Sequence, residues 1–92
     1  MSNQAVVNPE ELKRFADNLR RVNETVKDQQ RQLRGHFSRL SESWRDNEFS
    51  RFEEKFKDAM KALDKYLQSS DEHVPRLLKK AKAAEDYVNQ KM

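Results

Sequence analysis

Apolar residues in the first half of the chain recur at steps of three and four residues, with one step of seven in which Gln29 and Gln30 fill the expected apolar position. The series follows Asn8-Pro9, a pair typical of a helix start, and it ends at the tryptophan. Its members are Leu12, Phe15, Leu19, Val22, Val26, Leu33, Phe37, Leu40 and Trp44. Because such steps keep side chains on one face of an α-helix, the pattern predicts a helix over residues 9–43. The stripe is narrow, so a single neighbouring helix is expected to cover it.

A second series with the same spacing occupies the rest of the chain and predicts a helix over residues 48–90. Its main members are Phe49, Phe52, Phe56, Met60, Leu63, Leu67, Val74, Leu78, Ala81, Ala84 and Val88. The turn between the helices is expected at residues 44–47, with Asp46 as the N-cap of the second helix. Several positions of this second stripe are doubled, so it is wider and needs more than one neighbour.

Pro75 lies inside the second series. A proline within a helix removes one backbone hydrogen bond and strains the preceding turn. The apolar phase continues across Pro75, which favours one long, kinked helix. A break at this position, with Ser70 or Asp71 capping a new helix, is the alternative.

The two predicted helices form a single all-α domain over residues 1–92, an antiparallel helical hairpin. Folding at residue 45 opposes residues whose numbers add up to about 90, and both stripes are then apolar at matching heights. Examples are Phe37 with Phe52, Val26 with Leu63, and Phe15 with Val74. The stripes are therefore predicted to form the hairpin and dimer seam. A lone hairpin would leave half of the wider stripe in water, so we expect dimerisation into a four-helix bundle.

Composition and charge exclude several classes of protein. The 92 residues include one Gly, two Pro and no Cys, too few turn residues for a small barrel and none of the glycine-rich loops that bind nucleotides. Without Cys there are no disulfides or thiolate metal sites. The net charge of +3 arises from 19 basic and 16 acidic residues, a mixed surface rather than that of a nucleic-acid-binding protein. No apolar run resembles a membrane span or a signal peptide.

The candidate chemistry is sparse. His36 and His73 lack the spacing of metal ligands, and the acidic residues are scattered around both helices. No serine is accompanied by a plausible base. We therefore expect no enzymatic activity, no metal, no cofactor and no small-molecule substrate.

One short stretch of the second helix is strongly basic. It contains Arg76, Lys79, Lys80 and Lys82. Such a stretch can contact phosphate or an anionic membrane, which gives a nucleic-acid or membrane-surface binder as a weaker alternative function. A solvated helix face is the preferred interpretation, because no aromatic residue is interleaved with these cations.

The predicted turn reads Ser43-Trp44-Arg45-Asp46-Asn47-Glu48-Phe49-Ser50-Arg51-Phe52. With a tryptophan at the bend, a capping residue two positions later and an aromatic eight positions later, it resembles the WXG family. These are the small helical-hairpin proteins exported by type VII (ESAT-type) secretion systems. The third motif position is Asp46 instead of Gly. The resemblance implies a non-enzymatic binding protein, a secretion substrate or adaptor that leaves the cell without a cleavable signal peptide.

The family's export signal is a Tyr followed four residues later by an acid. Here Tyr87 is followed at that spacing by Lys91, and Tyr66 by Ser70, so neither pair matches. Export through a partner and a cytoplasmic location both stay open. The expected partners are a second copy or a paralogous hairpin, and a larger secreted protein or secretion component that could dock on Tyr87 and Val88. The main alternative is a cytoplasmic coiled-coil structural or adaptor protein unrelated to secretion.

Overall fold

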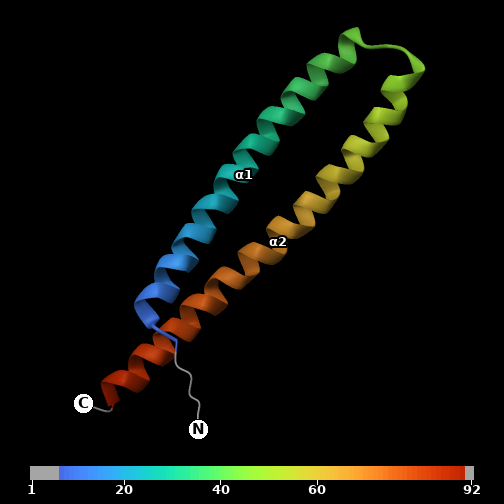
Figure 1. Ribbon diagram of the computed structural model, residues 1–92. Coiled ribbons are helices and arrows are strands. Elements are labelled where there is room, and N and C mark those ends of the chain that lie inside the picture. The colour runs from blue at the N-terminus through green and yellow to red at the C-terminus, as the bar shows by residue number, and fades with distance from the viewer. Residues whose placement is uncertain (1–6, 91–92) are drawn as a thin grey trace.

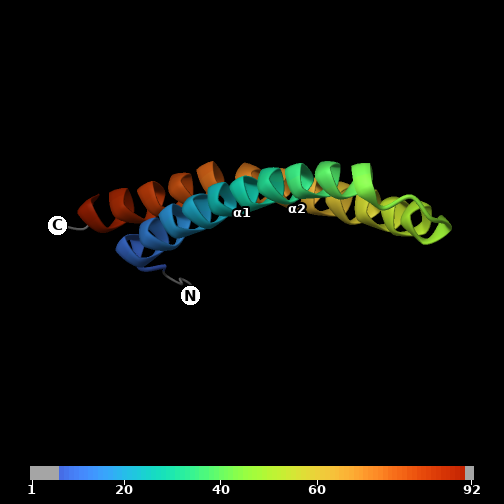
Figure 2. The same ribbon diagram turned by 90° about the horizontal axis from the view of Figure 1, so that it is seen from above.

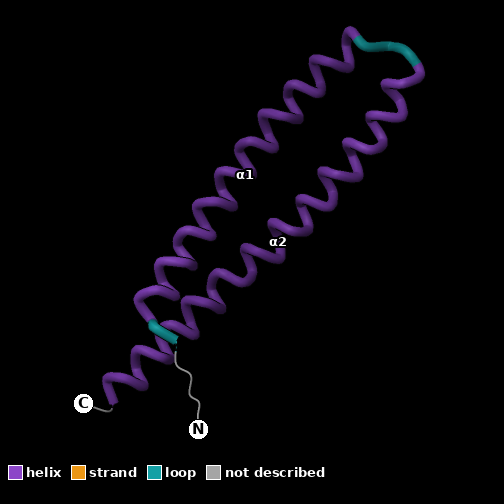
Figure 3. Tube along the Cα trace, in the orientation of Figure 1, coloured by secondary structure: helices purple, strands orange, loops and turns teal. Residues whose placement is uncertain are grey.

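The structure, a computed structural model that describes residues 7–90, consists of two long helices, α1 (Pro9–Ser43) and α2 (Asn47–Gln90). The helices run antiparallel and are joined by a short loop over residues 44–46 (Figures 1 and 3). The molecule is a rod of 69 × 22 × 14 Å. Within the described range there is no strand. The expected all-α helical hairpin is therefore confirmed.

The start of α1 is fixed by its N-cap. The Asn8 side-chain oxygen accepts hydrogen bonds from the backbone N–H groups of Glu10 and Glu11, at 3.0 and 3.2 Å. Pro9 occupies the first helical position, where its missing N–H costs nothing. The two glutamates lie in the first turn, at the positive end of the helix dipole.

The second helix continues through Pro75 without a break. It contains 44 residues against 35 in α1, and the extra length extends beyond the start of α1 (Figure 1). Seen from above, the hairpin is bowed along its length (Figure 2).

The two helices contact each other along a single line. On α1 this line consists of Ala16, Asn23 and Gln30, each seven residues from the next and at most 7% exposed. Leu67, Val74 and Ala81 form the corresponding heptad on α2. Because seven residues are almost two complete helical turns, each set returns to the same side of its helix. Two of the three α1 residues at this contact line are polar.

The apolar stripe of α1 is not covered by α2 as the sequence pattern predicts. Phe15, Val22, Leu33 and Leu40 are between 41% and 57% exposed. The expectation that one neighbour hides the stripe was wrong for these residues. Each of these residues comes one position before or three positions after a member of the seven-residue series on α1. They therefore lie beside the contact line, and a pair of helices buries only the residues between them.

The side-chain pairing also differs from the expected register. Asn23 contacts Ser70 and Asp71, where residue 67 was expected, and Lys13 contacts Glu85, where residue 77 was expected. In a helix the side chains lean toward its N-terminus, and in an antiparallel pair each side chain therefore leans toward the later turns of the partner helix. Each residue consequently meets a partner that is later in the sequence than the backbone heights suggest.

Candidate partner-binding surface

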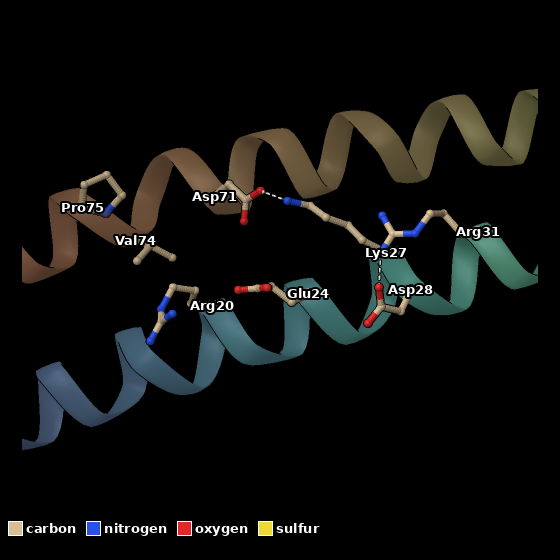
Figure 4. A pocket seen from close by; sticks show the side chains of 8 residues that line it. All are labelled: Arg20, Glu24, Lys27, Asp28, Arg31, Asp71, Val74 and Pro75. Carbon is tan, nitrogen blue, oxygen red and sulfur yellow. Dashed lines mark hydrogen bonds and ion pairs between the residues drawn. The ribbon is translucent and has the colours of Figure 1, made fainter.

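One edge of the hairpin is closed by ion pairs between the helices. The Nζ atom of Lys13 lies 2.7 Å from Oε2 of Glu85, and Nη2 of Arg34 lies 3.1 Å from Oδ2 of Asp64. Lys27 pairs with Asp71, and Figure 4 shows its side chain reaching across to the other helix. The basic residues come from α1 and the acids from α2. We call these three pairs the polar edge.

Two buried amides extend the polar edge into the contact line. Asn23 is 1% exposed, and its Nδ2 atom donates to Oγ of Ser70 at 2.9 Å and to Oδ1 of Asp71 at 3.0 Å. Gln30 donates to Oδ1 of Asp64 at 2.6 Å. Neither Asn23 nor Gln30 belongs to the apolar stripe that the sequence pattern predicts. The available signal was their seven-residue spacing from each other and from Ala16.

These contacts stabilise the ionised carboxylates. The hydrogen bond from Lys27 lowers the pKa of Asp71, with a further contribution from Asn23. The hydrogen bond from Gln30 lowers the pKa of Asp64, and that from Lys13 lowers the pKa of Glu85. A lowered pKa keeps each carboxylate charged and paired, which suits a structural role and not that of a proton donor near neutral pH.

The opposite side of the hairpin is apolar. Phe15 and Leu19 of α1 and Tyr66 and Leu77 of α2 line a hollow of about 410 Å³, together with Ser69, Ser70 and His73. Further along α1, Val22 is 56% exposed and Leu33 47%. On α2, Tyr66 is 62% and Phe52 42% exposed. We call this side the apolar face, with Phe15, Leu19, Val22, Leu33, Leu40, Phe52, Tyr66 and Leu77 as its members.

Helical geometry separates the two surfaces. Leu19 follows Ala16 of the contact line by three residues, which turns it about 60° to one side. Lys27 follows Asn23 by four residues, which turns it about 40° to the other side. The same offsets recur every seven residues along α1. The apolar face and the polar edge therefore flank the contact line on opposite sides over most of the length of α1.

The bend is organised around Trp44 and Asp46. Oδ1 of Asp46 accepts from the indole Nε1 of Trp44 at 2.8 Å, and also from the backbone N–H groups of Glu48 and Phe49. The same carboxylate thus caps α2 and orients the indole. The backbone N–H of Trp44 donates to the Leu40 carbonyl at 2.9 Å and closes the last turn of α1.

Aromatic rings fill the space next to the bend. The ring of Phe37 stacks on that of Phe56, with centroids 4.3 Å apart, and on that of Phe49 at 5.4 Å. Trp44 meets Phe49 edge-on at 5.4 Å and lies 5.8 Å from Phe52. The predicted turn residues are thus brought together, and Phe37 also contacts Phe52, its expected partner, at 5.9 Å. The aromatic rings, and not a broad core, hold this end of the hairpin.

The remaining predicted seam residues differ in how far the structure buries them. Leu67 and Val74 are buried on the contact line, whereas Leu78 is 38% exposed. Those of intermediate exposure are Leu12, Leu19, Val26, Phe37, Phe56 and Leu63. The candidate docking residues Tyr87 and Val88 are 54% and 46% exposed and lie near the end of α2, while Lys91 is outside the described residues.

Three further observations concern the part of the chain that the structure describes, residues 7–90. No three His, Asp or Glu side chains there are grouped so that they could hold a metal ion. Neither α1 nor α2 is long and apolar enough to cross a membrane. The four cations of the 76–82 stretch are exposed.

The fold and these surfaces define a class of protein: a small helical hairpin with an exposed apolar face and a tryptophan at its bend. The chain belongs to the WXG100 family, described as proteins of 100 residues with WXG, whose family model matches residues 4–89. The resemblance seen in the turn is thereby confirmed. Neither the curated proteins nor the solved structures contain a significant match to the chain.

Family membership associates the protein with type VII secretion. WXG100 proteins are non-enzymatic secretion substrates, and they typically form dimers of hairpins.

Proposed function

We propose that this protein acts by binding, as a secretion substrate or adaptor that pairs through its apolar face with a second copy of itself. The single observation that carries the proposal is the convergence of exposed apolar side chains from both helices on one side of the hairpin. Phe15 and Leu19 from α1 line the same hollow as Tyr66 and Leu77 from α2. A face that spans both helices matches the width that a second hairpin would cover in a four-helix bundle.

The distribution of charge supports the same surface. The polar edge already pairs its own cations and acids within the hairpin, so it offers little to an apolar partner. A two-fold axis would place the apolar face of one copy against that of the other, a self-complementary arrangement. The carboxylates with lowered pKa values, Asp64, Asp71 and Glu85, form ion pairs between the helices and do not line a catalytic pocket. This supports a binding role over an enzymatic one.

Leu33→Glu tests the pairing. Light scattering at micromolar concentration should give about twice the chain mass of 11.0 kDa for the wild type and the monomer mass for the variant. The reason is that a carboxylate would have to be buried without a partner in the apolar interface. Ala62→Glu is the matched control, because it places the same charge on an exposed helical position outside the apolar face. A wild type that is a helical, cooperatively melting monomer, or dissociation by both variants, would refute the proposal.

A further inference from the structure

A second hollow opens between the helices near the bend, on the same side as the polar edge. Its volume is about 340 Å³. Phe37, Phe56 and Met60 form its apolar lining, and all three are of intermediate exposure. Arg34, Lys57 and Lys61 complete the lining, so the hollow combines carbon surface with three cations and no acid. We call it the basic groove.

The charge of the basic groove follows from a change of sign along α2. Counting back in steps of seven from Glu85, the α2 residues of the polar edge include Asp71 and Asp64, and the next step is Lys57. In each of the three pairs of the polar edge an acid of α2 meets a base of α1. Lys57 lies one heptad nearer the bend than Asp64, beyond the last of these pairs, and the residue one heptad beyond Arg34 on α1 is the uncharged Ser41. Lys57 therefore takes the place of an α2 acid and has no acid of α1 opposite it.

The cations of the groove are only partly neutralised. Arg34 pairs with Asp64, but the Nζ atom of Lys57 is 3.8 Å from its nearest carboxylate partner, Glu53, and that lysine side chain is 67% exposed. Among the described residues, no carboxylate forms an ion pair with Lys61. An incoming acid would consequently find available lysines beside an apolar floor.

We propose that the basic groove binds an acidic, amphipathic peptide segment of a partner protein. A large apolar side chain of that segment would contact Phe37, Phe56 and Met60, and flanking carboxylates would pair with Lys57 and Lys61. The rings of Phe37 and Phe56 are stacked on each other, 4.3 Å apart, so they leave no slot into which a nucleotide base could insert. The volume is that of one or two side chains, which fits a short peptide anchor.

The cations of the groove are on the side of the polar edge, across the contact line from the apolar face. Its floor adjoins that face, because the ring of Phe52 lies 5.9 Å from that of Phe37 and 6.2 Å from that of Phe56. A second copy seated on the apolar face would therefore leave the three cations of the groove exposed.

The test measures binding of a fluorescein-labelled helical peptide, with a Leu-Phe pair flanked by glutamates, to the full chain by fluorescence anisotropy. Two control peptides replace the Leu-Phe pair by alanines or the glutamates by glutamines. We expect the acidic apolar peptide to bind and each control to bind at least about tenfold more weakly, because affinity requires both the apolar anchor and the charges.

Charge reversal locates the site on the protein. Lys57→Glu with Lys61→Glu should reduce the affinity by at least about tenfold. Lys55→Glu with Lys65→Glu is the matched control, since it makes the same change of charge on exposed residues of α2 that do not line the groove, and it should stay within about threefold. Helicity by circular dichroism and the mass by light scattering should be the same for both.

If both double variants lost the same affinity for the peptide, the overall charge of the protein would explain the binding, and the proposal would be overturned. So would equal binding of the alanine control peptide, which would show simple ion pairing, or preferential binding of a DNA oligonucleotide that the Lys57 and Lys61 substitutions abolish.

Discussion

At the scale of single residues, Asp46 explains how this chain departs from the family motif and retains the family fold. The glycine of the motif is replaced by a carboxylate that caps α2 and accepts the indole hydrogen bond of Trp44. An aspartate is among the best N-cap residues, and glycine at that position is only a few tenths of a kcal/mol poorer. The substitution therefore preserves the start of α2 and adds a contact that glycine cannot make.

Asp46→Ala should destabilise the hairpin by about 1–2 kcal/mol, because two backbone N–H groups and the indole lose their acceptor. Urea unfolding followed by circular dichroism measures this loss. Asp46→Asn is the control: its side-chain oxygen can accept the same bonds, so it should unfold close to the wild type. If the two variants lose stability equally, the charge of Asp46 and not its capping is what matters.

At the scale of the helices, the contact between α1 and α2 is thinner and more polar than usual. Asn23 and Gln30 take contact-line positions where apolar residues would contribute more to stability, and both are satisfied by acceptors on α2. A buried amide with a specific partner costs stability relative to a packed apolar residue but disfavours shifted registers, in which it would have no partner. This explains how so narrow an interface defines one pairing of the helices.

Pro75→Ala should stabilise the hairpin by about 1–3 kcal/mol. The helix continues through this exposed position, and alanine would restore the missing backbone hydrogen bond and relieve the strain of the ring. Urea unfolding should show a higher midpoint concentration, with an unchanged dependence of the unfolding free energy on urea. Arg76→Ala is the control at a neighbouring exposed position. Lower stability of Pro75→Ala would mean that the curvature set by proline is needed for packing.

At the scale of the whole molecule, the hairpin has two chemically different long sides. One is closed by ion pairs, and the other exposes aromatic and aliphatic side chains from both helices. A chain that buries so few side chains has little stability of its own. The ion pairs and any partner bound to the apolar face therefore contribute a large share of its free energy of unfolding.

The polar edge predicts a dependence of stability on acid. The pKa values of Asp64, Asp71 and Glu85 are lower in the folded chain than in the unfolded one. Their contribution is therefore complete above about pH 4–5, the unfolded range, and is lost as the pH falls through the folded pKa values. The melting temperature should change little between about pH 7 and pH 5 and should fall below about pH 4.

Asp71→Asn isolates one pair of the polar edge. The variant should melt lower than the wild type near neutral pH, and the difference should shrink in acid, where Asp71 of the wild type is itself protonated. Melting curves of both proteins across the acid range provide the measurement. A difference that stays constant with pH would show that Asp71 contributes through packing and not through its charge.

The local elements of this protein follow from interactions between residues close together in the sequence. Steps of three and four residues define a helix from neighbours along the chain, and Asn8 and Asp46 act through backbone groups only two or three residues away. The hairpin, its bend and the family motif could therefore be read before any tertiary contact was known.

The packing of α1 against α2 selects which residues of each helix lie on the contact line. The spacing of Phe15 and Val22 is as regular as that of Ala16 and Asn23, so periodicity alone does not say which set is the contact line. The choice depends on side-chain volume and on partners distant in sequence, such as Ser70 for Asn23 and Asp64 for Gln30. The basic groove likewise exists only because α1 and α2 bring Arg34 beside Lys57 and Lys61, residues that no local pattern connects.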